Sequence, residues 1–327
     1  MNDPASGRSE RRFEVTSFGE ALLRLSVEDG HRLETAGSFA VNVAGAELNV
    51  AAALAGLGRR VAWGGGLPAG RMGERVIRHL RCFGISTDCV VRVPDARLGT
   101  YYVELASAPR RTDVIYDRAG SAATRLRVDD MPWDQLLDTD VLHLTGITPA
   151  LGAGPADIVT EAVTRARATG AKVSFDVNFR AKLWSADAAA RTLAPLVSQV
   201  DLLICGEGDA ATVFGLSGSV EDVLGGLAHL APRAVVVLTG GERGASARVG
   251  DELLTAPGVP VAVRDGLGAG DALAAGVIDG WLEGSLQQGL SQGVALASMA
   301  LASAGDALEV TRSELDGVMS GGSRVQR

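Results

Sequence analysis

Short apolar segments alternate with helical patterns from about residue 140 onward, and this alternation limits the possible folds more than any other feature of the sequence. Strands are predicted at residues 141–145, 173–177, 202–205 and 233–238, and helices at 158–168 and 188–197. The strands are almost continuously apolar, as expected of strands that are buried on both faces. This order of segments is typical of βαβ units, so we expect an α/β protein with a mostly parallel sheet between layers of helices.

The N-terminal part of the chain contains two kinds of segment. Strands at 13–18 and 61–64 and helices at 46–57 and 72–83 continue the βα pattern. Residues 20–43 and 97–118 instead alternate apolar and polar side chains without helical spacing. We interpret these two segments as strands of a small, half-exposed sheet that forms a lid over the main sheet. The expected organisation is one domain at 13–319 with flexible ends at 1–12 and 320–327.

Charge and composition argue against several classes of protein. The net charge of -8 argues against binding of nucleic acid through a broad basic face. The longest apolar segment, at 294–304, is too short to span a membrane, and the polar N-terminus is not followed by a signal-peptide core. The three cysteines have neither zinc-site nor redox-pair spacing. We therefore expect a cytoplasmic protein that binds neither nucleic acid nor a membrane.

A glycine-rich segment carries the strongest chemical signal. Residues 265–271 read Asp-Gly-Leu-Gly-Ala-Gly-Asp and lead directly into a helix predicted at 272–281. Glycines at the start of a helix leave backbone N–H groups accessible, and such groups bind anions, phosphate above all. Asp271 lies in the first helical turn, where its carboxylate would face a group brought to the phosphate. The alternative is an aspartate that only opposes the helix dipole.

Other phosphate-binding patterns do not fit this sequence. A Walker A loop requires a Gly-Lys pair, which the chain lacks. The protein-kinase fold requires a strand lysine and a His-Arg-Asp loop, and neither Lys172 nor Lys182 has that context. The dinucleotide-binding fingerprint fails because Leu273 stands where its last glycine is needed. A phosphate site in this chain would therefore use backbone amides and arginines.

Two further segments place polar groups where a ligand could reach them. Residues 43–51 form a second glycine-containing entry to a helix, and Asn49 lies at the start of that helix, where an asparagine is usually present for a hydrogen bond. Asn178 and Arg180 follow a predicted strand, and ligands of open α/β sheets bind beyond the carboxyl ends of the strands. An ordinary capping network at Asn49 and a surface role for Arg180 are the alternatives.

Taken together, residues 265–276 and 44–51 resemble the C-terminal and N-terminal signatures of the PfkB (ribokinase-like) family of sugar kinases. The resemblance extends from about residue 13 to residue 306, and the two signatures lie about 220 residues apart. It implies a ribokinase-like three-layer αβα fold with a central, mostly parallel sheet and a small β-sheet lid, which in this family often also forms a dimer interface. It further implies ATP and Mg²⁺ as cofactors and leaves room for a monovalent cation.

Within the family, residues 98–104, 114–122, 146–149 and 176–184 resemble 2-dehydro-3-deoxygluconate kinases. The resemblance implies that Asp271 is the general base and that the amides of Gly268, Ala269 and Gly270 contribute an anion hole. The residues implied to contact the substrate are Gly45, Asn49, Tyr101, Tyr116, Arg118 and Arg180. Those implied to bind the nucleotide are Thr239, Gly241, Gly244, Gly268 and Gly270, and those implied to bind the metal are Glu207 and Asp209.

The reaction expected from this resemblance is transfer of the γ-phosphoryl group of ATP to the terminal hydroxyl of 2-dehydro-3-deoxygluconate. Arg118 and Arg180 would hold the sugar carboxylate bidentately, whereas a neutral sugar would leave two buried arginines without a partner.

Three alternatives stay open. The first is another sugar kinase of the family, of the fructokinase, ribokinase or 5-dehydro-2-deoxygluconokinase type. The second is a non-catalytic sugar or nucleotide sensor, because residues 206–209 read Gly-Glu-Gly-Asp where the family has Asn-x-x-Glu. The third, a dinucleotide oxidoreductase, is weakened by the failed fingerprint.

Overall fold

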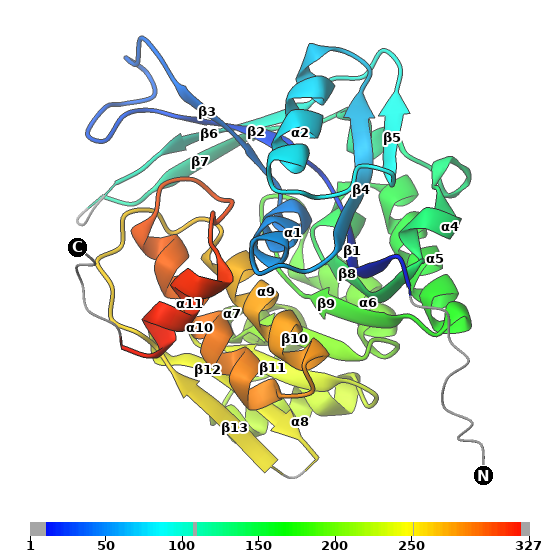
Figure 1. Ribbon diagram of the computed structural model, residues 1–327, viewed down its shortest axis with the longest axis vertical. Coiled ribbons are helices and arrows are strands. Elements are labelled where there is room, and N and C mark those ends of the chain that lie inside the picture. Colours follow the sequence, from blue (N-terminus) through cyan, green and yellow to red (C-terminus); the bar gives the residue numbers. More distant parts are fainter. Residues whose placement is uncertain (1–10, 107–109, 251, 322–327) are drawn as a thin grey trace.

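The computed structural model describes residues 11–106, 110–250 and 252–321 and contains a large sheet, a smaller sheet and helices on both faces of the large one (Figure 1). Within the described residues, the strand order of the large sheet is β13-β12-β11-β10-β9-β8-β1-β4-β5. Neighbouring strands from β5 to β11 are parallel, whereas the β11–β12 and β12–β13 pairs are antiparallel. The expected mostly parallel sheet is confirmed. The strands are β1 (Phe13–Phe18), β4 (Val61–Pro68), β5 (Val90–Val93), β8 (Thr139–Thr145), β9 (Lys172–Asp176), β10 (Leu202–Gly206), β11 (Val235–Thr239), β12 (Gly244–Val249) and β13 (Glu252–Pro257).

Two layers of helices enclose this sheet. The helices on one face are α1 (Ala46–Gly56), α2 (Arg71–Cys82), α9 (Ala269–Leu282) and α10 (Leu286–Ala302). Those on the other are α3 (Ala122–Arg125), α4 (Trp133–Leu136), α5 (Ala153–Thr169), α6 (Ala186–Val197), α7 (Glu207–Phe214) and α8 (Val220–Leu230). A last helix, α11 (Arg312–Met319), packs with α10, and the short 3-10 helices are η1 (Val128–Asp130), η2 (Thr148–Leu151) and η3 (Gly241–Arg243).

The apolar strands are explained by burial on both faces. In β8, Val141 belongs to the core that includes α1 and α9, whereas its neighbour Leu142 belongs to the core that includes α5. Successive side chains of a strand point to opposite faces, so a strand covered on both sides has to be apolar throughout. The same property made these strands visible in the sequence.

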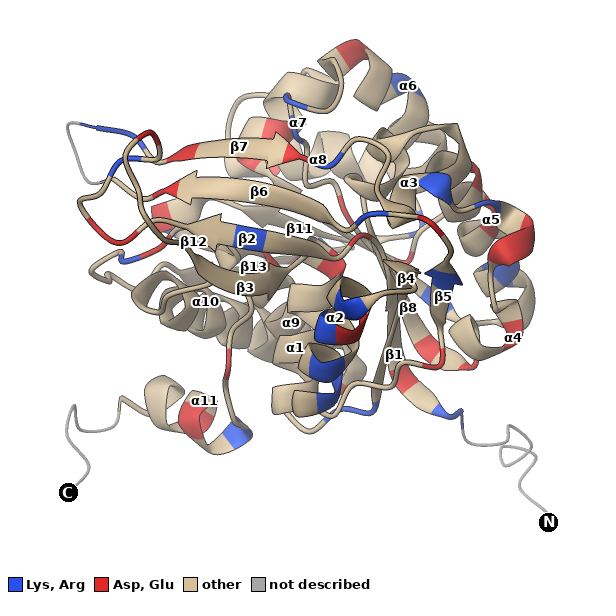
Figure 2. Ribbon diagram, turned by 90° about the horizontal axis from the view of Figure 1, so that it is seen from above, with Lys and Arg blue, Asp and Glu red and all other residues tan. Residues whose placement is uncertain are grey.

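The smaller sheet is formed by the two segments interpreted as a lid. Its strand order is β3-β2-β6-β7, with β2 (Leu22–Ser26) parallel to β6 (Gly99–Glu104) and antiparallel to β3 (Ala40–Ala44), and with β7 (Asp113–Asp117) antiparallel to β6. Figure 2 shows the four strands side by side at the edge of the molecule. The chain enters this sheet only a few residues after β1 ends, so the small sheet adjoins the carboxyl ends of the main strands.

Some elements were not predicted. The hairpin of β12 and β13 at the edge of the large sheet combines small and polar residues with partly exposed apolar ones, and this composition hides a strand. The helices α7, α8 and α11 also escaped the sequence analysis.

The ends of the chain are described only in part. Residues 1–10 and 322–327, for which flexibility was expected, lie outside the described residues. The side chain of Arg11 is held, since it donates hydrogen bonds to the carbonyl oxygens of Leu137 at 2.8 Å and Thr169 at 2.7 Å. Within the described part of the chain, every helix is too short or too polar to cross a membrane.

Candidate active site

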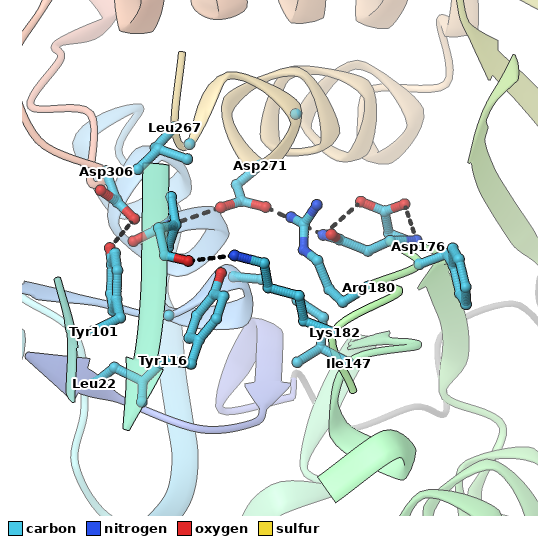
Figure 3. Close-up of a pocket in the computed structure, with 18 of the residues that line it drawn as sticks. Leu22, Tyr101, Tyr116, Ile147, Asp176, Arg180, Lys182, Leu267, Asp271 and Asp306 are labelled. Carbon is cyan, nitrogen blue, oxygen red and sulfur yellow. Dashed lines mark hydrogen bonds between the residues drawn. The ribbon is translucent and has the colours of Figure 1, made fainter. Parts of the chain in front are cut away.

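A cavity of about 630 Å³ lies between the lid sheet and the carboxyl ends of the main strands (Figure 3). Its walls come from the lid strands β2, β6 and β7, the start of α1, the segment after β9, and the glycine-rich loop before α9. The cavity therefore lies where open α/β sheets bind their ligands.

The glycine-rich loop enters α9 through a position that only glycine can occupy. Gly268, the residue that precedes α9, has φ +82°, and a Cβ added there would stand 2.1 Å from the carbonyl oxygen of Asp306. Only glycine tolerates both conditions. Cβ atoms added at Gly266 and Gly270 would meet no other atom within 4 Å. These two residues thus leave open space along the cavity that they line.

Asp271 is buried in the first turn of α9 and is held by two amides (Figure 3). Asn49 Nδ2 donates to Asp271 Oδ2 at 2.7 Å, and Asn178 Nδ2 lies 3.4 Å from Asp271 Oδ1. Burial raises the pKa of Asp271 to about 7. A carboxylate with such a pKa, fixed beside a cavity, suits a general base at neutral pH.

Asn178 is itself held by the strand it follows. Its φ is +40°, and Asp176 accepts hydrogen bonds from its backbone N–H at 3.2 Å and from its Nδ2 at 3.3 Å. Asparagine is among the residues that tolerate this left-handed conformation. Asp176 therefore positions the amide that faces Asp271.

Three carboxylates gather on this side of the cavity. Burial raises the pKa of Asp176 to about 8, and the negative charges of Asp271 and Asp209 contribute to the rise. Burial also raises the pKa of Asp209, although Phe179 N–H donates to it at 3.0 Å. The charge of Arg180 lowers the pKa of each, but burial dominates. A cation bound beside these three carboxyl groups would therefore offset the cost of burying them.

This cluster fits the way in which proteins hold Mg²⁺ on a nucleotide. Mg²⁺ keeps several waters and usually takes only one or two carboxylates together with substrate phosphates. The described residues offer no group of three or more His, Cys, Asp or Glu that could hold a metal ion. Asp209 lines the cavity beside Asp176, whereas Glu207, the other expected metal ligand, does not line it and pairs with Arg243.

The two arginines expected to hold a carboxylate differ from the prediction. Arg118 is buried, but Glu20 accepts hydrogen bonds from its Nε at 2.7 Å and from its Nη2. Arg180 is exposed, and no described residue forms a hydrogen bond or ion pair with it. The expectation of two buried, unpaired arginines was therefore wrong, because a buried acid neutralises one of them and solvent reaches the other.

A second cavity, of about 620 Å³, adjoins the first. Thr239 and Gly270 line both, and Gly241, Gly244 and Ala269 line only the second. Apolar residues form much of its wall, namely Val259, Pro260, Val261, Val263, Leu273, Val294, Ala297 and Leu301. The predicted residues that the structure brings together at the first cavity are Gly45, Asn49, Tyr101, Tyr116, Arg118, Arg180, Asp209, Thr239, Gly268, Gly270 and Asp271.

Several residues of the site were missed. Glu47 is buried at the cavity and accepts hydrogen bonds from Thr145 Oγ1 and Thr148 Oγ1, both at 2.7 Å. Glu20 and Asp306 also line the cavity. For Glu47, the sequence did carry a signal, namely an acidic residue among small apolar ones at the start of a predicted helix. For Glu20 and Asp306 there was no signal, because their partners are distant in the sequence.

The comparisons with known proteins agree with this geometry. The profile of pfkB family carbohydrate kinases matches residues 12–311. The chain belongs to this family. It is 37% identical over 310 residues to 2-dehydro-3-deoxygalactonokinase of Haloferax volcanii, an alignment that covers 94% of this chain and 97% of that protein. The family and its ribokinase-like fold were therefore predicted correctly, and the match favours a kinase over the dinucleotide oxidoreductase.

Solved structures give the same result. The crystal structure of 2-dehydro-3-deoxygluconokinase from Thermotoga maritima superimposes with a TM-score of 0.90 and is 30% identical, covering 96% of this chain and 100% of that one. A putative ribokinase II from E. coli, solved in complex with ATP and Mg²⁺, has a TM-score of 0.84 at 20% identity and covers 94% and 99% of the two chains. At that identity, the second neighbour establishes the shared fold.

Proposed function

We propose that this carbohydrate kinase transfers the γ-phosphoryl group of ATP to the terminal hydroxyl of 2-dehydro-3-deoxygluconate. The observation that carries the proposal is the position of Asp271. It is a buried carboxyl with a pKa raised to about 7, next to Gly270, which is one of the two described residues that line both cavities. A base at this junction faces a sugar on one side and a phosphate on the other.

The chemistry follows from the groups at that junction. Asp271 Oδ accepts the proton of the sugar hydroxyl while the hydroxyl oxygen bonds to the γ-phosphorus and the bond to the β–γ bridging oxygen breaks, which releases ADP. The amides of Asn49 and Asn178 hold the carboxylate in place. Backbone N–H groups of residues 268–270, at the positive end of α9, stabilise the charge on the transferred phosphoryl group.

Mg²⁺ would be held by Asp209, with Asp176 beside it, and would supply charge neutralisation of the phosphates when bound. The raised pKa values of these two acids support this assignment, since a cation relieves the cost of burying them. The pairing of Glu207 with Arg243 leaves Asp209 as the better candidate of the two predicted ligands.

Within the cavity, one cation favours a sugar acid over a neutral sugar, although the charge of the wall as a whole does not. Acidic side chains dominate its wall, Arg118 is neutralised by Glu20, and Lys182 donates its Nζ to the carbonyl oxygen of Val114 at 2.5 Å. Arg180 is left as a permanent cation that no described residue pairs with. A substrate carboxylate would complete this site.

The second cavity suits the nucleotide. Its apolar wall can receive a base, and its shared border with the first cavity directs the phosphates to the glycine-rich loop. The ATP and Mg²⁺ bound in the E. coli neighbour support the same cofactors here. Closure of the lid sheet over the sugar would exclude water and limit ATP hydrolysis.

We extend the proposal to a dimer formed through the lid. On the face of the small sheet opposite to Tyr101 and Tyr116, Val41, Tyr102 and Ile115 form an apolar row across the strands together with Leu25, and Ile115 is 50% exposed. A second copy of the chain would cover this row. Light scattering should give twice the chain mass for wild type and the single mass for Ile115→Asp. A monomeric wild type would contradict the dimer.

We also place the reaction in the cytoplasm, in keeping with three cysteines that form no disulfide.

The substrate class is tested by ADP release. The purified protein is assayed with ATP and Mg²⁺ and with 2-dehydro-3-deoxygluconate, its galacto epimer, gluconate, fructose, ribose or no sugar. Turnover that prefers the two deoxy keto acids supports the proposal. Turnover only with a neutral sugar would keep the family and overturn the substrate. Binding of the sugar acid without ADP formation would favour the sensor.

A further inference from the structure

Arg24 is a buried arginine in the middle of lid strand β2, where it interrupts an apolar segment (the blue band on β2 in Figure 2). Its side chain is 2% exposed and does not line the first cavity, which the proposed function assigns to the sugar and which is called the sugar cavity below. Nε donates to Ser26 Oγ at 2.7 Å, Nη2 pairs with Asp265 Oδ2 at 2.5 Å, and Nη1 donates to Asp306. A buried charge is costly unless it is paired and hydrogen-bonded, so the two carboxylates are what makes an arginine tolerable here.

The two carboxylates that Arg24 joins support the glycine-rich loop. Asp265 Oδ1 accepts from Leu267 N–H at 3.1 Å and Oδ2 accepts from Gly305 N–H at 3.2 Å. The carbonyl oxygen of Asp306 packs so closely on Gly268 that a Cβ there would lie 2.1 Å away. The segments at residues 265 and 305–306, which both contact the glycine-rich loop, are therefore linked through the guanidinium of Arg24.

A second residue of the lid sheet, Tyr101, also binds Asp306. Tyr101 on β6 is the direct register partner of Arg24 on β2. The hydroxyl of Tyr101 donates to Asp306 Oδ2 (Figure 3). Arg24 Nη1 donates to Oδ1 of the same carboxylate. Two neighbouring lid strands thus hold Asp306 from the same side. Tyr101 also lines the sugar cavity, so its contact with Asp306 lies next to the reacting groups.

We propose that Arg24 is a positioning residue that couples the docking of the lid sheet to the ordering of the anion hole, so that neither occurs without the other. The inference rests on the proposed function, because it takes the loop at 265–270 as the anion hole. Without Arg24, Asp265 and Asp306 would be two buried acids with no cation between them, close to the place where phosphates arrive. The loop would then loosen and repel the nucleotide.

The test compares Arg24→Met and Arg24→Lys with a matched control, Arg97→Met. Arg97 is also a lid arginine, but it is exposed and pairs with Asp117 on the neighbouring strand. We measure kcat, the KM values for ATP and sugar, and amide hydrogen exchange of residues 22–26 and 264–270.

Arg24→Met should lower kcat by about 10- to 100-fold, which is the usual effect of a misplaced catalytic group. It should raise the KM for ATP more than that for the sugar, since Arg24 does not line the sugar cavity. Exchange should increase in both segments together. Arg24→Lys should lie in between because it keeps the charge and loses the fork, and Arg97→Met should match wild type.

Two results would overturn the inference: an unchanged kcat in Arg24→Met, or faster exchange in residues 22–26 with unchanged exchange in 264–270. Hydrogen exchange needs no turnover, so a wild type inactive on every sugar would refute the proposed function while the coupling is still decided by exchange. If Arg24→Met does not fold, Arg24→Lys and Tyr101→Phe replace it. Unchanged exchange of the loop in both would overturn the coupling.

Discussion

Replacing Arg180 with methionine should remove most of the preference for a sugar acid over a neutral sugar. Arg180 follows β9 and lines the cavity with an exposed guanidinium that no described residue pairs with (Figure 3). Arg118 differs because Glu20 already neutralises it. A substrate carboxylate therefore gains a full ionic partner at Arg180 and little net charge at Arg118.

The size of the effect follows from the type of contact. A hydrogen bond to a charged group contributes about 1.5–3 kcal/mol, and each 1.4 kcal/mol is about tenfold in kcat/KM. Because solvent reaches Arg180, we expect the lower part of that range, about 10- to 30-fold. Arg180 also lowers the pKa of Asp271, so its loss affects every substrate. The ratio of acid to neutral sugar removes this shared effect.

The assay is ADP release with 2-dehydro-3-deoxygluconate and with 3-deoxyfructose, in which an alcohol replaces the carboxylate and the terminal hydroxyl is kept. Lys182→Met is the control, since Lys182 lines the same cavity but donates to the carbonyl oxygen of Val114. The acid-to-neutral ratio of kcat/KM should fall in Arg180→Met and change less in Lys182→Met and Arg118→Met. An unchanged ratio in Arg180→Met, or a larger fall in Arg118→Met, would refute the reasoning.

Three further predictions concern protonation and backbone geometry. The value of kcat/KM should rise with pH through about 7, because burial raises the pKa of Asp271 to about 7 and only its ionised form accepts a proton; a flat pH profile would speak against this. Asp176→Asn should stabilise the fold, and raise Tm, more at pH 8 than at pH 5; the difference in stabilisation is at most about 4 kcal/mol, because about three pH units at about 1.4 kcal/mol each separate the two conditions. The native state keeps a proton up to a pKa of about 8 that the unfolded chain loses near 3.8, so wild-type stability falls between those values, and equal Tm shifts at both pH values would contradict the account. Gly268→Ala should destabilise the fold by about 1–3 kcal/mol in urea unfolding, since φ is +82° and Asp306 O blocks a Cβ, whereas Gly208→Ala, which has open space, should not; equal stability of the two variants would refute this.

The sequence predicted the elements whose burial is uniform. The strands β8 to β11 are covered on both faces, so their apolar runs were visible without any long-range information. The hairpin of β12 and β13 lies at the sheet edge, where small and polar residues are mixed, and no local pattern marks it. The fold class could therefore be predicted from the strands that helices cover on both faces, and not from the strands at the edge of the sheet.

The site could be predicted only where chemistry is local. Asp271 lies in a glycine-rich motif, and its position at the start of α9 was predicted from the adjacent residues. The pairing of Arg118 with Glu20 joins positions 98 residues apart, and that of Arg24 with Asp306 joins positions 282 apart. Such pairs have no sequence signal, although a lone arginine within the apolar segment of β2 was a visible anomaly.

The central claim is that Asp271 takes the proton of a sugar acid hydroxyl during phosphoryl transfer. The most direct measurement is the kcat of ADP release by Asp271→Asn and wild type with 2-dehydro-3-deoxygluconate, ATP and Mg²⁺. We predict a loss of about 100-fold or more, with a Tm no lower than that of wild type and a similar Kd for ATP. A near-normal kcat in a folded Asp271→Asn variant would contradict the account.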